Sequence, residues 1–252
     1  MIDQKTLAYI NLYAILGTLE NLCELVPEAS ELAQTKKPLS IGFDVKGGPS
    51  ATITFKNGKC RMEQGCNKCN VKLPFSSCEK FNGLIDGTVT PIPSKGFAHI
   101  GFLLKKFTPL TDILNKYLRA SEEDLADEAF FNTSTTLMLN LITVAIAQIG
   151  NNDPIGKASA KHMVDGEISF GIKGGISTTV RVKNHRLLGI KCPSEAPRAS
   201  MSFESIKLAR DLFDGKVNAV ACIGTGEIEM KGMISMLDNL NRILDRVAVY
   251  LA

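Results

Sequence analysis

The 252-residue sequence predicts an α+β protein built from two tandem copies of one small domain. Two observations predict this class. The phrase IGFDVKGG at Ile41–Gly48 returns 127 residues later as ISFGIKGG at Ile168–Gly175. In each half, a helical apolar pattern is followed by alternating strand patterns and then by further helices, which is typical of a sheet with helices on one face.

The repeat extends beyond this phrase. Lys56-Asn57 pairs with Lys183-Asn184 at the same offset, and Asp86-Gly87 pairs with Asp214-Gly215 after the offset has grown by one residue. A nearly constant offset of this length indicates a duplicated domain. The charged segment RASEED at 119–124 separates the halves, so we expect a first domain at 1–120 and a second at 121–252.

Each half begins with an apolar helical segment, at 6–26 and at 129–149. In the first segment the apolar residues recur at helical spacing, and Pro27 is expected to end the helix because proline cannot continue the hydrogen-bond ladder. This opening segment is therefore predicted to be a long helix in both halves.

About five strands are predicted in each half. Three alternating runs come first, with Asn57-Gly58 or Asn184-His185 as a tight hairpin turn between the second and third. A fourth strand, NVKLPF or RASMSF, precedes a short helix that Ser76 or Ser202 is expected to cap. The last strand is predicted at 96–102 or 226–232, and an amphipathic helix ends each half.

The second half, from ASMSFESIKLARDLF through GEIEMKG into the last helix, resembles the sterol carrier protein two (SCP-2-like) family of lipid-transfer domains. The resemblance covers roughly 168–251 and extends more weakly, through the repeat, over 41–118. It implies a mixed, mostly antiparallel sheet whose helices enclose an apolar tunnel for sterols, fatty acids or acyl chains. In the first half, Pro91 and Pro93 exclude the short helix that the second half has at this point.

The resemblance also implies a function. It points to non-enzymatic binding or transfer of a long apolar ligand, with no catalytic residue and no cofactor. The residues expected to line the tunnel are apolar positions of the second half: Phe203, Ile206, Leu208, Leu212, Phe213, Val220, Met233, Met236, Leu237 and Leu240. Apolar helix faces also form ordinary cores, so the alternative is a structural or interaction module whose tunnels are filled with side chains.

Four of the seven cysteines, Cys60, Cys66, Cys69 and Cys78, lie close together in the sequence. Cys66 and Cys69 form a C-x-x-C motif, and two thiolates at this spacing can serve a zinc site or a redox pair. Cys60 pairs with Leu187 in the repeat, which indicates a core residue. The three interpretations are thus a metal site, a redox pair and reduced thiols without a chemical role. We predict no metal site; if there is one, Cys66 and Cys69 are its candidate ligands.

Composition excludes several classes of partner. A net charge of +3 and the absence of tryptophan argue against nucleic acid. The longest apolar stretch, 137–149, is shorter than the ~20 residues of a membrane span, so no transmembrane segment is expected. An odd number of cysteines without an export signal favours the cytoplasm. The expected partner is a lipid or another apolar small molecule, and a homo-oligomer stays open.

Overall fold

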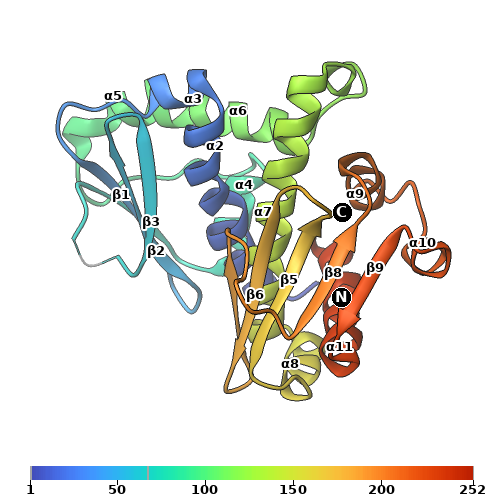
Figure 1. Ribbon diagram of the computed structural model, residues 1–252. Coiled ribbons are helices and arrows are strands. Elements are labelled where there is room, and N and C mark those ends of the chain that lie inside the picture. The colour runs from blue at the N-terminus through green and yellow to red at the C-terminus, as the bar shows by residue number, and fades with distance from the viewer. Residues whose placement is uncertain (1, 67, 252) are drawn as a thin grey trace. The chain divides into compact units, whose positions relative to one another are not determined.

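The computed structural model describes residues 2–66 and 68–251 and divides into two compact units, Asp3–Ala126 and Asp127–Ala252. Each unit combines helices with one mixed sheet, of four strands in the first unit and five in the second (Figure 1). This confirms the predicted α+β class.

The first unit begins with a helical segment of changing pitch: α1 (Gln4–Tyr9), the π-helical turn η1 (Ile10–Ile15), the 3-10 turn η2 (Leu16–Thr18) and α2 (Leu19–Leu25). Asp3 caps α1, because its carboxylate accepts a hydrogen bond of 2.8 Å from the Thr6 amide. Val26 is extended, and Pro27 starts α3 (Pro27–Leu32). The predicted helix thus ends where proline was expected to end it.

The first sheet consists of β1 (Leu39–Val45), β2 (Ser50–Lys56), β3 (Lys59–Gln64) and β4 (Val71–Phe75) in the order β3-β2-β1-β4. β1 is parallel to β4, and the other pairs are antiparallel. Asn57 and Gly58 both have positive φ angles, 51° and 78°, as a tight hairpin turn requires. The buried Phe43 packs its ring against Phe81, so helices cover this face of the sheet.

After β4 the first unit is helical: α4 (Cys78–Ile85), η3 (Phe97–His99), α5 (Ile100–Phe102), η4 (Leu103–Phe107), α6 (Thr108–Leu118) and η5 (Asp124–Ala126). The strand predicted at 96–102 is therefore wrong. Just before it, a single bridge joins Lys95 to Lys72 of β4. The chain turns helical because Phe102 and Phe107 pack on Phe55, with ring centroids 5.4 and 6.1 Å away.

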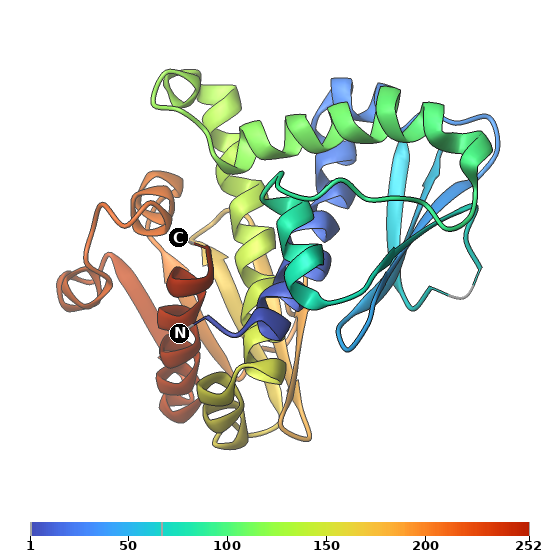
Figure 2. The ribbon, with the colours of Figure 1, turned by 180° about the vertical axis from the view of Figure 1, so that it is seen from behind.

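The second unit follows the same order: α7 (Glu128–Asn152), α8 (Pro154–Lys161), β5 (Gly166–Ile172), β6 (Ser177–Lys183), β7 (Arg186–Ile190), β8 (Ala199–Phe203), α9 (Ile206–Phe213), α10 (Ala219–Thr225), β9 (Ile228–Gly232) and α11 (Ile234–Leu251). Its strand order is β7-β6-β5-β8-β9. Helices α7, α8 and α11 lie on one side of this sheet (Figure 2). The caps of α4 and α9 are Ser77 and Ser205, not the predicted Ser76 and Ser202.

Helix α7 is the central helix of the second unit. It packs closely on β7: a Cβ added to Gly189 would lie 2.6 Å from the Thr143 carbonyl oxygen. The hydroxyls of Thr143 and Thr178 lie 2.6 Å apart and join the helix to β6. Among the described residues, α7 alone is long and apolar enough to cross a membrane, but 61% of its apolar window is buried inside the protein, as in the core helix of a globular domain.

Candidate functional site

The predicted lining residues lie on β8, α9, α10 and α11 of the second unit and at the end of β9. They differ in exposure. Four are buried: Phe203, Met236, Leu237 and Leu240. Four on α9 are half-buried: Ile206, Leu208, Leu212 and Phe213. Two are exposed, Met233 and Val220, the latter at 77%. The ten positions therefore include core residues and surface residues.

The aromatic members of this set are brought together. Phe203 on β8 contacts Phe213 at the end of α9, with ring centroids 5.8 Å apart and an interplanar angle of 87°. On its other side Phe203 meets Phe170 of β5 at 5.4 Å and 83°. Edge-to-face pairs of this kind stabilise packing beyond the area that they bury. A row of three rings thus runs from the sheet to α9.

Helix α9 is held by a buried arginine that the sequence analysis did not single out. Arg210 is 4% exposed, and its guanidinium donates a 2.7 Å hydrogen bond to the Ser134 hydroxyl on α7. The same guanidinium pairs with Asp214 at 3.0 Å. A buried charge is costly unless it is paired and hydrogen-bonded, and Arg210 is both. The i, i+4 spacing of Arg210 and Asp214 in the sequence could have indicated this ion pair on a helix.

Helix α10 is apolar and yet mostly exposed. Asn218 caps it by accepting a 3.0 Å hydrogen bond from the Ala221 amide, and Gly226 ends it with a φ of 84°. Within α10 only Cys222 is buried. The helix packs beside β9, at the edge of the sheet. It therefore presents apolar side chains, Val220 foremost, at this edge of the sheet.

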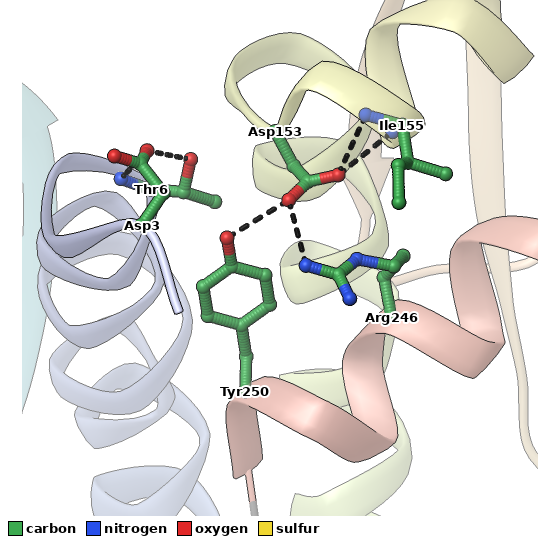
Figure 3. A network of polar contacts seen from close by, with 7 residues as sticks. Asp3, Thr6, Asp153, Ile155, Arg246 and Tyr250 are labelled. Atoms are coloured by element: carbon green, nitrogen blue, oxygen red, sulfur yellow. Dashed lines mark hydrogen bonds and ion pairs between the residues drawn. The ribbon is translucent and has the colours of Figure 1, made fainter. Parts of the chain in front are cut away.

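Helix α11 has one buried face, which packs on β8, α7 and α8. Near its end Arg246 and Tyr250 meet Asp153, the cap of α8 (Figure 3). Asp153 is 1% exposed and accepts hydrogen bonds from Tyr250 at 2.8 Å, from Arg246 at 3.1 Å, and from two backbone amides of α8. With its oxygens satisfied from several sides, this carboxylate acts as a structural joint.

A surface cavity of about 330 Å³ lies beside this joint, between α8 and α11. Its lining consists of Ile155, Ala158, Ser159, His162, Arg242, Asp245 and Arg246. None of these belongs to the ten predicted lining residues. The cavity is thus separate from the apolar positions that the sequence singles out.

The cysteines of the first unit form two pairs. The Sγ atoms of Cys66 and Cys69 lie 3.8 Å apart, and those of Cys23 and Cys60 lie 3.9 Å apart. Cys60 is buried, as expected for a core residue, and so is Cys78. Among the described residues, no three histidine, cysteine or acidic side chains converge on a point that could hold a metal ion. Within the part of the chain that the structure describes, Cys66 and Cys69 are therefore not joined by a third side chain of these types at a metal site.

Comparison with known proteins gave the following results. No protein-family model matches the sequence, and no curated protein matches it. Among solved structures, the chain is similar to a UbiJ-SCP2 ubiquinone synthesis protein at 17% identity, with 47% of this chain and 98% of that one covered and a TM-score of 0.34. It is also similar to sterol carrier protein 2 from Yarrowia lipolytica in its apo form, at 24% identity, with 44% and 90% covered and a TM-score of 0.30.

A third similar structure is the stereoselective inverting sec-alkylsulfatase Pisa1 from Pseudomonas sp.. The identity is 10%, 57% of this chain and 28% of that one are covered, and the TM-score is 0.30. Two of the three proteins carry SCP2 or sterol carrier protein in their names, the family that the sequence resembles.

Proposed function

We propose that the second unit binds a long apolar ligand, such as a fatty acid, an acyl ester or a sterol-like lipid, and that the chain is a carrier and not an enzyme. The observation that carries this proposal is α10, an apolar helix of the second unit that is left mostly exposed beside β9. The sequence resemblance to SCP-2-like lipid-transfer domains supports it. The odd number of cysteines favours reduced thiols, which suits a carrier that works in the cytoplasm.

The binding energy would come from apolar surface. Val220 on α10 is exposed, and Ile206, Leu208 and Leu212 on α9 are half-buried. A ligand chain that contacted both α9 and α10 would remove these side chains from water, at ~25 cal/mol per Å² of apolar surface buried. Arg210 and its partners hold α9 in place, so the ligand would move α10 in preference to α9.

The test uses the purified full chain. We expect native mass spectrometry or solvent extraction to reveal a co-purifying lipid, and a fluorescent fatty acid to bind at micromolar concentration. Val220→Asp should weaken this binding about tenfold or more, because a carboxylate would be desolvated in an apolar contact. Leu188→Asp is the matched control, since Leu188 is 53% exposed on the opposite edge strand of the same sheet. Failure of both lipid assays would refute the proposal.

A second candidate is a structural or interaction module with a filled interior. The row of rings formed by Phe170, Phe203 and Phe213 favours it, because these side chains fill space between the sheet and α9. Phe213→Leu distinguishes the two functions. A loss of stability without a change in fatty-acid affinity would support the module, whereas a change in affinity would support the carrier.

We further infer that the two units arose by tandem duplication. Their strand registers agree: Ile41 lies opposite Ile53, and 127 residues later Ile168 lies opposite Val180. In the parallel pair Ile41 lies beside Val71, whereas Ile168 lies beside Ala199. The offset thus grows by one residue between the third and fourth strands, where the sequence repeat also slips.

Helix–sheet contacts support the duplication as well. At one equivalent contact of the two units, the larger side chain comes from the strand in one unit and from the helix in the other. In the first unit a Cβ added to Gly17 would lie 3.7 Å from the Met62 sulfur. At the equivalent positions of the second unit, the helix carries Val144 and the strand carries Gly189, and a Cβ added to Gly189 would lie 2.8 Å from the Val144 Cα. One large and one small residue meet in both units, in opposite order.

A second equivalent contact differs in the same manner. Cys23 meets Cys60 in the first unit, and 127 residues later Gly150 meets Leu187. Two side chains of medium size, Cys23 and Cys60, thus correspond to a glycine without a side chain and a large leucine, Gly150 and Leu187. Volume-conserving exchanges are the ones that cores tolerate, so both contacts fit descent from one ancestral pair of elements.

A further inference from the structure

We propose that Cys66 and Cys69 form a reversible disulfide, so that the first unit carries an oxidation site for low-molecular-weight disulfides. The two cysteines lie between β3 and β4, both are partly exposed, and their Sγ atoms are 3.8 Å apart. The inference is independent of lipid binding, which concerns the second unit.

A glycine makes room for both sulfur atoms. A Cβ added to Gly42 of β1 would lie 2.3 Å from the Cys66 Sγ and 2.7 Å from the Cys69 Sγ. Real Cβ atoms do not approach other atoms this closely, so any side chain at position 42 would displace the thiols. Since successive strand residues point to opposite faces, the thiols lie on the face of the sheet opposite the buried Phe43. Both sulfurs therefore converge on one point over β1.

The backbone on either side of the pair is fixed to neighbouring strands. Next to Cys66, the Gly65 amide donates to the Ser50 carbonyl and the Gly65 carbonyl accepts from the Thr52 hydroxyl, each at 2.8 Å. Next to Cys69, the Asn70 side chain accepts a 2.8 Å hydrogen bond from the Ser40 amide, and the Asn70 amide donates to the Ser40 hydroxyl at 3.0 Å. Rotation of the two side chains would thus have to shorten the sulfur distance to the ~2.05 Å of a disulfide.

The equivalent loop of the second unit is built differently. There Ser194 donates to Glu167, and Glu167 pairs with Arg181 at 2.7 Å. Ser169 takes the place of Gly42 at the 127-residue offset, and Cys192 takes the place of Gly65. Polar contacts hold that loop, whereas the thiol pair occupies this place in the first unit.

The buried pair Cys23 and Cys60 provides an internal control. Its sulfur distance, 3.9 Å, is nearly the same, but the two residues are 4% and 9% exposed. Cys66 and Cys69 are partly exposed in the folded protein, so we expect a dissolved oxidant to react with them before it reacts with the buried pair. Exposure, and not sulfur separation, therefore distinguishes the two pairs.

The reaction is a thiol–disulfide exchange in two steps. The Cys69 thiolate attacks one sulfur of a small disulfide RSSR; the S–S bond of the reagent breaks, and RS⁻ leaves and takes up the proton that Cys69 lost. Cys66 then attacks the Cys69 sulfur of the mixed disulfide, and the second RS⁻ leaves with the proton of Cys66. In total, two protein thiols are oxidised and one RSSR is reduced to two RSH. Cys66 is assigned the second step because burial, and then the nearby charge of Cys69, raise the pKa of its thiol to about 11.

The test exposes the reduced full chain to glutathione buffers of increasing redox potential, followed by acid quenching, alkylation and tryptic mapping. Cleavage after Lys68 separates the two cysteines into peptides 62–68 and 69–72. We expect these peptides to be recovered linked and ~2 Da lighter than the sum of their reduced masses, because two hydrogens are lost. Cys23 and Cys60 should stay reduced in the same buffers. If instead the buried pair oxidises first, or no linked peptide forms, the proposal is wrong.

Three variants sharpen the test. Cys66→Ser should stop the reaction at a glutathione adduct on Cys69, and Cys69→Ser should form its adduct more slowly, because burial raises the pKa of the remaining Cys66 thiol. Gly42→Ala should lower the disulfide fraction at a given potential, with circular dichroism to show that it folds. If Gly42→Ala fails to fold, the glutathione adduct on Cys69 of the Cys66→Ser protein still tests the proposal. A Cys66→Ser protein in which Cys69 remains unmodified would overturn the proposal.

Discussion

At the scale of single residues, Asp153 shows how one carboxylate stabilises a junction of three segments. It follows α7, caps α8 and accepts hydrogen bonds from Arg246 and Tyr250 of α11 (Figure 3). The Arg246 guanidinium also lies 5.4 Å from the centre of the Tyr250 ring. Loss of the carboxylate would leave a largely buried guanidinium without its partner, which costs more than the pair itself contributes.

We therefore predict that Asp153→Ala lowers the free energy of unfolding by about 3 kcal/mol. The control is Asp127→Ala, which removes the cap of α7, where the carboxylate accepts one amide hydrogen bond at 2.7 Å. That variant should cost only ~1 kcal/mol, the usual effect of a lost helix cap. Urea denaturation of both variants measures the difference. Equal losses would show that the contacts with Arg246 and Tyr250 add nothing.

The same carboxylate predicts a pH dependence. Burial raises the pKa of Asp153, but the hydrogen bonds from Gly156, Arg246 and Tyr250 together hold it below the ordinary value. A lowered pKa contributes stability above the unfolded value of ~3.9, and this stability is lost as the pH falls through the folded value. The stability gap between wild type and Asp153→Ala should thus be constant near neutrality and shrink below about pH 4. Thermal melts across this range test it, and a gap that widens in acid would contradict it.

At the scale of elements, β9 pairs with β8 along its whole length and ends at a tightly packed glycine. Gly232 has a φ of 91°, and a Cβ there would lie 2.2 Å from the Arg198 carbonyl oxygen. Gly232→Ala should destabilise the protein by about 2 kcal/mol or more, since strain and overlap act together. Gly224→Ala in α10 is the control, because nothing lies within 4 Å of its added Cβ. Thermal melting of the two variants tests this, and similar midpoints would contradict it.

The contact between α7 and β7 gives a second prediction at this scale. A Cβ added to Gly150 would lie 2.7 Å from a Leu187 methyl group. Gly150→Ala alone should destabilise, whereas in a Leu187→Val background it should be neutral or stabilising, because alanine favours a helix by up to ~1 kcal/mol over glycine. A double-mutant cycle should thus give a coupling of about 1 kcal/mol or more. Additive effects would show that the helix and strand do not compete for this space.

Local patterns sufficed for most strands and failed where distant packing decides. Alternation and the Asn57-Gly58 turn correctly predicted the meander of the first sheet. The run at 96–102 has the same alternation, yet the chain is helical there. This run follows Pro91 and Pro93, and the rings of Phe102 and Phe107 pack on Phe55. Seven residues of alternation cannot distinguish these outcomes, because the deciding contacts are more than forty residues away in sequence.

The candidate site was only partly predictable for the same reason. Met236, Leu237 and Leu240, which were expected to line a tunnel, lie on the buried face of α11. Helical spacing could not show that Val220 remains exposed, since α10 has apolar residues on every side. Likewise, the approach of Cys66 and Cys69 to Gly42 depends on a pairing between strands that no local spacing reveals.

At the scale of the whole molecule, the two units differ where the ligand is proposed to bind. The second unit has α10 and a full fifth strand, β9. At the equivalent place, the first unit has the single bridge between Lys72 and Lys95, and η3, α5 and η4 follow. The rings of Phe102 and Phe107 pack directly on the sheet of that unit. On this basis the first unit has its apolar face covered by its own chain.

We therefore predict one bound lipid per chain, held by the second unit. Native mass spectrometry of the full chain, titrated with a fatty acid, should show a single adduct at saturation. Val220→Asp should remove this adduct, whereas Leu104→Asp in η4 should retain it, although Leu104 is a comparably exposed apolar residue at 66%. Two adducts per chain would mean that the first unit also binds lipid. Loss of the adduct in Leu104→Asp alone would assign the site to the first unit, because η4 belongs to that unit.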